Sequence, residues 1–324
     1  MPADTFAGMP HLSIVIPTFN QPAELWFTLQ CALQQLKLLE EKYTNDWWEI
    51  VVADNVRGGD KLTKKIVGDL HDKRVRYLNS SAVQSPYHPR NDGAAAAKGE
   101  WLLFLDSHVL MSPSFFERVA QSTHPHTRER FRYPDNAIVH YPVIFGNRTR
   151  KWGHYKLKLD TDFWGSWGPK APTDRAISEI GATGIWAMCM RRSWYLDELK
   201  GFNPLFKGYS GGEPYLDLKS WCLGGSVLID AGVYGAHYSG PRSYGAQWRD
   251  RIRNFALAIE VLDPSRFPTF EAHYVAKTKN PGMVASAIVE GRKLAAAEAA
   301  DFGARRRYKV SEVLELFKSR GVPH

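Results

Sequence analysis

Four short apolar segments alternate with three helical segments in the first third of the chain, and this alternation restricts the fold more than any other feature. The apolar segments have the length of strands, whereas the segments between them carry apolar residues at helical spacing. Such an alternation over about 100 residues indicates a parallel sheet wound with helices. We expect strands over residues 12–17, 48–53, 75–78 and 101–105, and helices over residues 22–41, 61–71 and 90–99.

The second half of the chain is less regular. Its pattern predicts strands over residues 184–190 and 227–229, and helices over residues 215–223 and from residue 247 onward. We therefore expect one α/β domain over residues 1–245, made of halves 1–110 and 111–245, followed by a helical C-terminal extension over residues 246–324.

Composition narrows the class of protein. No apolar stretch of about 18 residues is present, so the sequence predicts no membrane-spanning helix. Residues 1–10 lack the pattern of a signal peptide, and the three cysteines show neither metal-ligand nor disulfide spacing, so we expect a cytoplasmic protein. The net charge of +8 favours polyanionic partners.

Asp106, Ser107 and His108 directly follow the apolar segment 101–105. A strand of that composition is buried on both faces, and its carboxyl end is where an open α/β sheet binds ligands. A carboxylate and an imidazole separated by one small residue suit a divalent ion such as Mn²⁺ or Mg²⁺. An ordinary polar turn is the alternative explanation for this triplet on its own.

Other expected strands also end in polar residues. Thr18 and Asn20 follow the first strand, Asp54 and Asn55 the second, and His237 a later one. In an open parallel sheet these ends form one crevice, which we expect to hold a nucleotide base and ribose. Arg90 opens the alanine-rich helix, where charge and helix dipole together favour a phosphate. Taken singly, each of these residues also fits a helix cap or a turn.

Five segments together resemble a known family, and they are residues 13–20, 51–55, 93–108, 208–214 and 235–238. The pattern is similar to the family-2-like glycosyltransferases of GT-A fold, and the D-S-H form of the acidic motif looks like the polypeptide N-acetylgalactosaminyltransferases. The glycine-rich segment before Glu213 resembles their W-G-G-E-N motif, with Tyr209 and Ser210 in place of its Trp and Pro214 in place of its Asn.

The resemblance implies a GT-A fold, which is a mostly parallel sheet wound with helices, with residues 1–110 as the nucleotide-binding half. Residues 111–245 would hold the acceptor and complete the metal site. It also implies a UDP-sugar donor, hexose or N-acetylhexosamine, and bound Mn²⁺ or Mg²⁺. The implied metal ligands are Asp106, His108 and His237, and the implied nucleotide contacts are Thr18, Asn20, Asp54, Asn55, Arg90, Gly93, Asp106, Trp186 and Arg242.

Two carboxylates are candidates for the chemical step. Glu213 reaches the sugar or the acceptor side in the resemblance, and a carboxylate there supports an oxocarbenium-like transition state or takes the acceptor's proton. Asp217 is the alternative base, although its place one helical turn later also fits a cap or salt bridge. The D-S-H motif favours retention of configuration.

The acceptor is expected to be polyanionic. Residues 128–170 interleave Arg and Lys with aromatic residues, and Arg305–Arg307 add a second basic cluster. Cations beside aromatic stacking platforms are typical of nucleic-acid grooves, so a hydroxymethylated pyrimidine of DNA, as in phage-type DNA modification, is the favoured acceptor. A solvated basic face is the alternative. We also expect residues 242–249 to form either a lid over the diphosphate, with Arg242 as a cationic clamp, or an ordinary loop.

Two further functions stay open. The same chemistry on protein Ser/Thr or on a glycan or cell-surface polysaccharide is the first alternative. A non-catalytic nucleic-acid-binding protein on the same fold is the third possibility, and the presence of both the metal-ligand and the Glu213 motifs argues against it.

Overall fold

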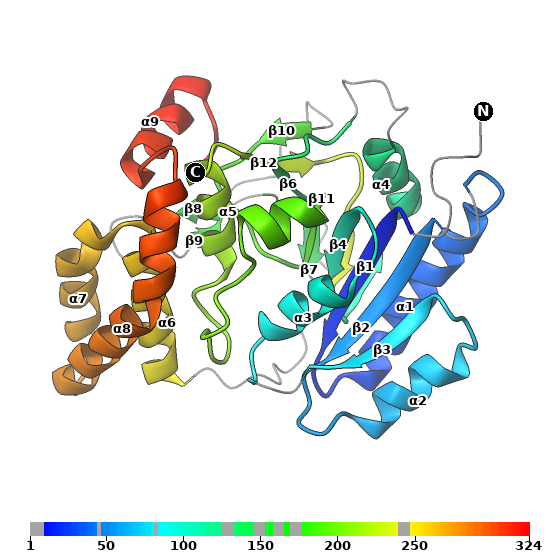
Figure 1. Cartoon of the computed structure of the whole chain (residues 1–324), viewed down its shortest axis with the longest axis horizontal. Coiled ribbons are helices and arrows are strands. Elements are labelled where there is room, and N and C mark those ends of the chain that lie inside the picture. The colour runs from blue at the N-terminus through cyan, green and yellow to red at the C-terminus, as the bar shows by residue number, and fades with distance from the viewer. Residues whose placement is uncertain are drawn as a thin grey trace.

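The computed structural model describes residues 10–43, 47–80, 83–124, 132–145, 153, 155–157, 165–168, 177–238 and 247–324. Its centre is a sheet of eight strands in the order β10-β12-β6-β11-β4-β1-β2-β3 (Figure 1). The strands are β1 (Leu12–Thr18), β2 (Trp48–Asp54), β3 (Val75–Asn79), β4 (Trp101–Leu105), β6 (Ala137–His140), β10 (Ile177–Glu179), β11 (Ala187–Arg191) and β12 (Ser226–Asp230). The four strands expected in the first third of the chain are confirmed to within a residue.

The sheet is mixed rather than wholly parallel. Strands β4, β1, β2 and β3 are parallel to one another, and β6 is parallel to β12. Strand β11 runs antiparallel between β4 and β6, and β10 is antiparallel to β12. The fold class expected from the sequence is therefore confirmed, with β11 as the strand that reverses direction next to the site.

Two smaller sheets accompany the large one. The first has the order β5-β13-β7, with β5 (Val109–Met111), β13 (Gly235–His237) and β7 (Val143–Phe145). The second pairs β8 (Tyr155–Leu157) with β9 (Gly165–Trp167). Strand β5 follows β4 after three residues, so the pairing of β13 with β5 brings His237 beside the end of β4.

Helices cover both faces of the large sheet. The α-helices of the described chain are α1 (Pro22–Leu38), α2 (Lys61–Asp69), α3 (His88–Ala96), α4 (Phe115–Thr123), α5 (Glu213–Cys222), α6 (Trp248–Leu262), α7 (Phe267–Val275), α8 (Pro281–Arg305) and α9 (Val310–Arg320). A π-helical turn over Trp194–Glu198 and a 3₁₀ turn over Pro264–Arg266 connect some of these elements.

Alternate residues of β4 enter two different cores. Leu103 and Leu105 pack with residues of α1 and α4, whereas Leu102 and Phe104 pack with residues of α3 and α5. Successive side chains of a strand point to opposite faces, and covering both faces requires the continuous apolar run seen here. Helices α3 and α5 therefore lie on one face of the strand that ends at Asp106.

The C-terminal helices lie at the opposite end of the molecule from α1 and α2 (Figure 1). They share the core of the α3–α5 face, since residues of α6, α8 and α9 belong to that core. Lys219 of α5 is completely buried, and its ammonium group lies 2.5 Å from Glu298 of α8. This ion pair and the shared core fasten the extension to the helix that begins at Glu213. In the described part of the chain, no helix combines the length and hydropathy needed to cross a membrane.

Candidate active site

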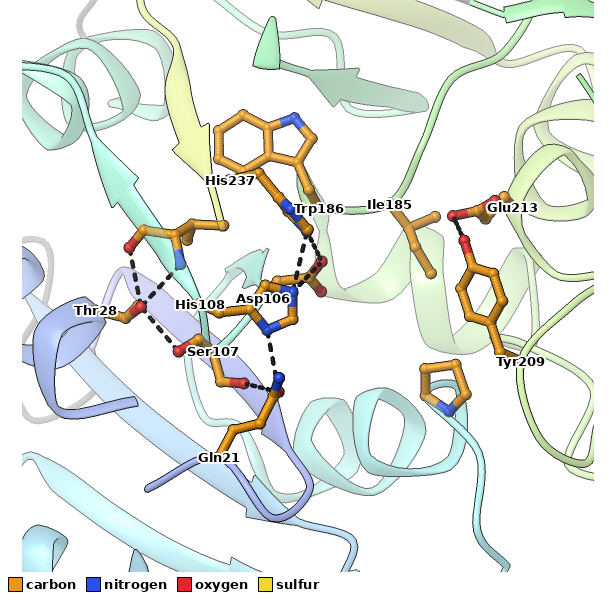
Figure 2. Close-up of polar contacts among 12 residues, drawn as sticks. Gln21, Thr28, Asp106, Ser107, His108, Ile185, Trp186, Tyr209, Glu213 and His237 are labelled. Carbon is orange, nitrogen blue, oxygen red and sulfur yellow. Dashed lines mark hydrogen bonds and ion pairs between the residues drawn. The ribbon is translucent and has the colours of Figure 1, made fainter. Parts of the chain in front are cut away.

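Three side chains meet where β4 ends and β13 passes beside it (Figure 2). His237 Nε2 lies 3.3 Å from Asp106 Oδ2 and 3.1 Å from His108 Nε2, and His108 Nε2 lies 4.0 Å from the same carboxylate oxygen. The sequence predicted this trio as metal ligands from two separate segments. The structure brings them together because β5 and β13 are antiparallel neighbours.

The donor set fits a divalent ion. Ligands held at right angles about 2.1 Å from one ion lie about 3 Å apart, which is close to the two spacings that involve His237. Burial alone would raise the pKa of Asp106, but Arg90 and the two histidines outweigh it and lower that pKa to about 2. Burial also lowers the pKa of His108. The two effects favour the deprotonated forms of Asp106 and His108, as metal binding requires.

Arg90 orients the Asp106 carboxylate. Its guanidinium is 2% exposed, pairs with Asp106 Oδ1 and donates to the carbonyl oxygen of Ile185 at 3.2 Å. The other carboxylate oxygen, Oδ2, faces His237. The sequence placed Arg90 at the start of a helix, facing phosphate. The structure places it inside α3, which begins at His88, and buries it against the metal-site carboxylate.

The D-S-H turn is held from the α1 side. Gln21 Oε1 lies 3.1 Å from His108 Nδ1 and accepts a hydrogen bond from Ser107 Oγ at 3.2 Å. Thr28 Oγ1 donates toward the carbonyl oxygens of Ser107 and Val109, at 3.0 and 2.9 Å. Sequence reasoning did not include Gln21 or Thr28, because nothing in the pattern of α1 marks a residue that reaches across to another strand end.

Trp186 backs the site. Its carbonyl oxygen accepts a hydrogen bond from the Asp106 amide at 2.8 Å, and its indole nitrogen donates to Tyr141 O at 2.8 Å. A Cβ at Gly235 would lie 2.3 Å from the indole ring, so β13 approaches this closely only with glycine there. Trp186 is 4% exposed and therefore presents little of its surface to a ligand.

The two candidate carboxylates have different surroundings. Glu213 is the first residue of α5, and its Oε1 accepts a hydrogen bond from the Tyr209 hydroxyl at 2.7 Å. Figure 2 shows this pair across from the metal ligands, with Ile185 between them. Asp217 is 1% exposed, with Oδ1 2.8 Å from His140 Nε2 and Oδ2 accepting from the Thr183 amide at 3.0 Å. Both oxygens of Asp217 are thus engaged inside the core.

The residues at the first two strand ends differ in their surroundings. Thr18 is 2% exposed, and its hydroxyl has no hydrogen-bond partner among the described residues. Asn20 is exposed with φ of 53°, a left-handed conformation that asparagine tolerates. Asp54 accepts hydrogen bonds from two backbone amides and from the Tyr77 hydroxyl, and Asn55 bonds to the segment 80–85. Both side chains shape the loops around the crevice.

Gly93 has a packing role that the sequence did not predict. A Cβ at this position would lie 2.3 Å from Val15 Cγ1, so the absence of a side chain lets α3 approach β1. The nucleotide contact assigned to Gly93 stays a prediction. Arg242 lies outside the described residues, as does most of the lid segment 242–249.

The two basic segments were expected to bind a nucleic-acid acceptor, and the structure describes them only in part. Arg305 bonds to Asp301 and to the Glu198 carbonyl oxygen, and Arg306 donates to Leu262 O at 3.2 Å. Several hydrogen-bond donors of these two arginines are therefore already bound to acceptors within the chain. About half of the segment 128–170 lies outside the described residues.

A cavity of about 490 Å³ lies on the α1 side of the two histidines. Its wall is largely apolar, and Phe27, Leu110 and Tyr238 are exposed there. Among the described residues that line it, Glu24 is the acidic one and there is no Lys or Arg. The cavity therefore suits an uncharged group better than a phosphate backbone.

The chain was compared with known sequences. Residues 13–199 match the family model described as glycosyl transferase family 2. A 121-residue stretch, 37% of this chain, is 34% identical to 26% of validoxylamine A glucosyltransferase from Streptomyces hygroscopicus subsp. jinggangensis (strain 5008). A stretch of 237 residues, 68% of the chain, is 25% identical to 40% of putative polypeptide N-acetylgalactosaminyltransferase 13 from Drosophila melanogaster. The chain spans less than half the length of these curated relatives.

Solved structures share the fold. The crystal structure of GalNAc-T7 with UDP, GalNAc and Mn²⁺ superposes with a TM-score of 0.65 at 16% identity, over 91% of this chain and 57% of that one. S. aureus TarS 1-349 in complex with UDP-GlcNAc gives a TM-score of 0.56 at 14% identity, over 96% and 92% of the two chains. These likenesses show the GT-A fold, and because the family model spans more than half of the sequence, the chain belongs to glycosyl transferase family 2.

Proposed function

We propose that this protein is a metal-dependent glycosyltransferase that moves a sugar from a UDP-sugar to a hydroxyl acceptor. The convergence of Asp106, His108 and His237 on one point at the carboxyl edge of the sheet carries the proposal. Structural neighbours with the same fold were crystallised with a nucleotide or nucleotide sugar, and one of them also with Mn²⁺. Membership of family 2 supports the same reaction class.

In this reaction, negative charge develops on the diphosphate of the leaving group and must be stabilised. The bond between the anomeric carbon and the diphosphate oxygen breaks, its electron pair leaves with UDP, and the acceptor oxygen forms the new bond to that carbon. A bound divalent ion would neutralise the charge that develops on the diphosphate. Asp106, His108 and His237 would hold that ion, and Arg90 keeps Oδ2 of Asp106 turned toward it.

Glu213 is the proposed catalytic carboxylate. It stands at the N-terminus of α5, where the helix dipole stabilises its charge, and the Tyr209 hydroxyl fixes one of its oxygens. From there it would stabilise an oxocarbenium-like transition state or accept the proton of the acceptor hydroxyl. We propose retention of configuration on the likeness of the D-S-H motif. Thr18, whose buried hydroxyl lacks a described partner, is the strongest of the proposed nucleotide contacts.

The donor sugar is proposed to be a hexose or an N-acetylhexosamine. For the acceptor, a hydroxymethylated pyrimidine of DNA remains the hypothesis drawn from the net charge of +8 and the segment 128–170. The engaged side chains of Arg305 and Arg306 and the apolar cavity beside the histidines do not add to it. A protein hydroxyl or a glycan is the alternative acceptor.

A transfer screen tests the proposal. The protein would be incubated with UDP-sugars and Mn²⁺ together with hydroxymethylated DNA, plain DNA, a Ser/Thr peptide pool or an oligosaccharide, and products would be read by mass spectrometry. A sugar-sized mass gain on modified DNA alone supports the DNA acceptor. A gain on peptide or oligosaccharide keeps the chemistry and rejects DNA.

Metal dependence has its own controls. Asp106→Ala and His237→Ala should abolish transfer and Mn²⁺-dependent donor binding, whereas His273→Ala on α7 should change neither. Full turnover in excess EDTA, or in the two ligand variants, would show that the site does not use a metal. Binding of DNA without any transfer, in the presence of Mn²⁺ and every donor, would favour the non-catalytic alternative.

A further inference from the structure

The side chain of Gln21 does not stabilise the helix that it precedes. Gln21 stands at the N-cap position of α1, yet its side chain makes no capping hydrogen bond. Instead it reaches the D-S-H turn, where Oε1 lies 3.1 Å from His108 Nδ1 and 3.2 Å from Ser107 Oγ (Figure 2). The side chain therefore contacts two neighbouring residues after β4 instead of capping its own helix, which indicates a role at the D-S-H turn.

The arrangement of His108 decides which ring nitrogen carries the proton. Its Nε2 faces the nitrogen of His237 at 3.1 Å and belongs to the cluster with Asp106. A metal ligand must present a lone pair, so Nε2 is the unprotonated nitrogen and Nδ1 carries hydrogen. An acceptor facing Nδ1 is therefore required, and an amide oxygen supplies it.

We propose that Gln21 is a positioning residue for the metal site, which fixes His108 in the tautomer that binds the ion. The Ser107 hydroxyl donates to the same amide oxygen and so helps to hold that oxygen beside the imidazole. This assigns a use to the middle residue of the D-S-H motif. The inference rests on the proposed metal dependence of the site.

The physical reason is the geometry of ligation. An imidazole rotates about its side-chain bonds, and a hydrogen bond to the nitrogen that does not bind metal limits that rotation and raises the basicity of the other nitrogen. Thr28 already holds the backbone on both sides of His108 through Ser107 O and Val109 O. Gln21 adds the constraint on the ring itself. Loss of such a partner typically weakens metal binding by about 10–100-fold.

Three variants of α1 test the role. Gln21→Leu keeps the size of the side chain and removes the acceptor, Gln21→Glu keeps an acceptor oxygen, and Gln30→Leu changes an exposed glutamine of the same helix. Mn²⁺ affinity would be measured by calorimetry on the full chain without donor or acceptor. We expect Gln21→Leu to bind Mn²⁺ about 10–100-fold more weakly, with Gln21→Glu and Gln30→Leu close to the wild type and melting temperatures unchanged.

A second measurement needs no variant. Long-range ¹H–¹⁵N spectra of the metal-free wild type should show the His108 ring protonated at Nδ1, and this preference should weaken in Gln21→Leu. Protonation at Nε2 in the wild type, Mn²⁺ affinity of Gln21→Leu within twofold of wild type, or equal loss in Gln21→Glu would each overturn the role of Gln21. If the wild type itself does not bind Mn²⁺, both the proposed metal site and the proposed role of Gln21 are rejected.

Discussion

Arg90 and Asp106 form a buried ion pair in which the two oxygens of the carboxylate face different partners. Oδ1 pairs with the guanidinium, and Oδ2 faces His237 Nε2 at 3.3 Å. Arg90 is 2% exposed, so neither water nor salt screens the pair effectively. The same contact that lowers the pKa of Asp106 also aims its second oxygen at the metal position.

Replacing Arg90 by Met should lower the free energy of unfolding, and the size of this decrease should depend on pH. Removing one partner of a buried pair costs about 3–5 kcal/mol, and we expect Arg90→Met to lose that much stability at pH 7. With a folded pKa of about 2, below its usual value of 3.8, Asp106 stabilises the protein above pH 4, and this contribution disappears as the pH falls toward 2. The difference between variant and wild type should therefore shrink over that interval.

Urea denaturation at several pH values measures this effect. Lys65→Met is the matched control, because Lys65 forms an exposed pair with Asp69 and should lose at most about 1 kcal/mol. Equal losses in the two variants would mean that the Arg90 pair is not a buried one. A gap that widens toward low pH would contradict the direction of the Asp106 shift.

Gly93 offers a second test of how α3 is placed. Because an added Cβ would lie 2.3 Å from Val15 Cγ1, Gly93→Ala should push α3 away from β1 and cost about 1–3 kcal/mol. Gly303→Ala in α8, where nothing lies within 4 Å, should instead stabilise by about 0.5–1 kcal/mol. Thermal unfolding would rank the two. Val15→Ala in the Gly93→Ala background should recover part of the loss, and its failure to do so would refute the steric explanation.

Glu298 should couple the C-terminal helices to the rest of the fold. It binds Lys219 and accepts hydrogen bonds from Asn203 and Tyr215. Burial lowers the pKa of Lys219, and Glu298 opposes that shift. Glu298→Gln removes the opposing charge, so we expect a loss of about 3 kcal/mol at pH 7.

The pH dependence of this variant has a defined sign. A lysine whose pKa is lower in the folded than in the unfolded protein destabilises the fold at pH values where the unfolded chain keeps that lysine protonated. This penalty disappears as the pH rises toward 10, so the stability of Glu298→Gln should then approach that of the wild type. Denaturation at pH 7 and pH 9.5 would measure it. Glu290→Gln, at the same helix but in a partly exposed pair with Arg249, should show neither the loss nor the recovery.

What the sequence could predict follows from what its patterns encode. Continuous apolar runs of strand length predicted the strands, and the polar residues after them predicted that Asp106, His108 and His237 lie near one edge. Patterns do not encode which way a side chain turns. The sequence did not predict the contact of Arg90 with Asp106, and the contact of Gln21 with His108 depends on how α1 packs beside β5, a tertiary contact. The phosphate contact expected of Arg90 stays a prediction.

Glu213 and Asp217 show the same limit from the side of the chemistry. Both are acidic, both lie in the first turns of α5, and their spacing does not distinguish them. The structure does, since Asp217 is held by His140 and Thr183 within the core, whereas Glu213 stands across from the metal ligands (Figure 2). Glu213 should therefore act on substrate, and Asp217 should tie α5 to β6.

Paired isosteric variants separate these roles. Glu213→Gln keeps the shape of the side chain and its contact with Tyr209, so we expect transfer to fall by about 10²–10⁴-fold with stability changed by less than about 1 kcal/mol. Asp217→Asn weakens two buried hydrogen bonds, so we expect a stability loss of about 1–3 kcal/mol while transfer at a temperature well below unfolding falls less than tenfold. Initial rates and urea denaturation of the same preparations give both quantities. The reverse pattern, with turnover lost in Asp217→Asn and kept in Glu213→Gln, would make Asp217 the catalytic carboxylate, because only a group that touches the reacting atoms loses rate without losing fold.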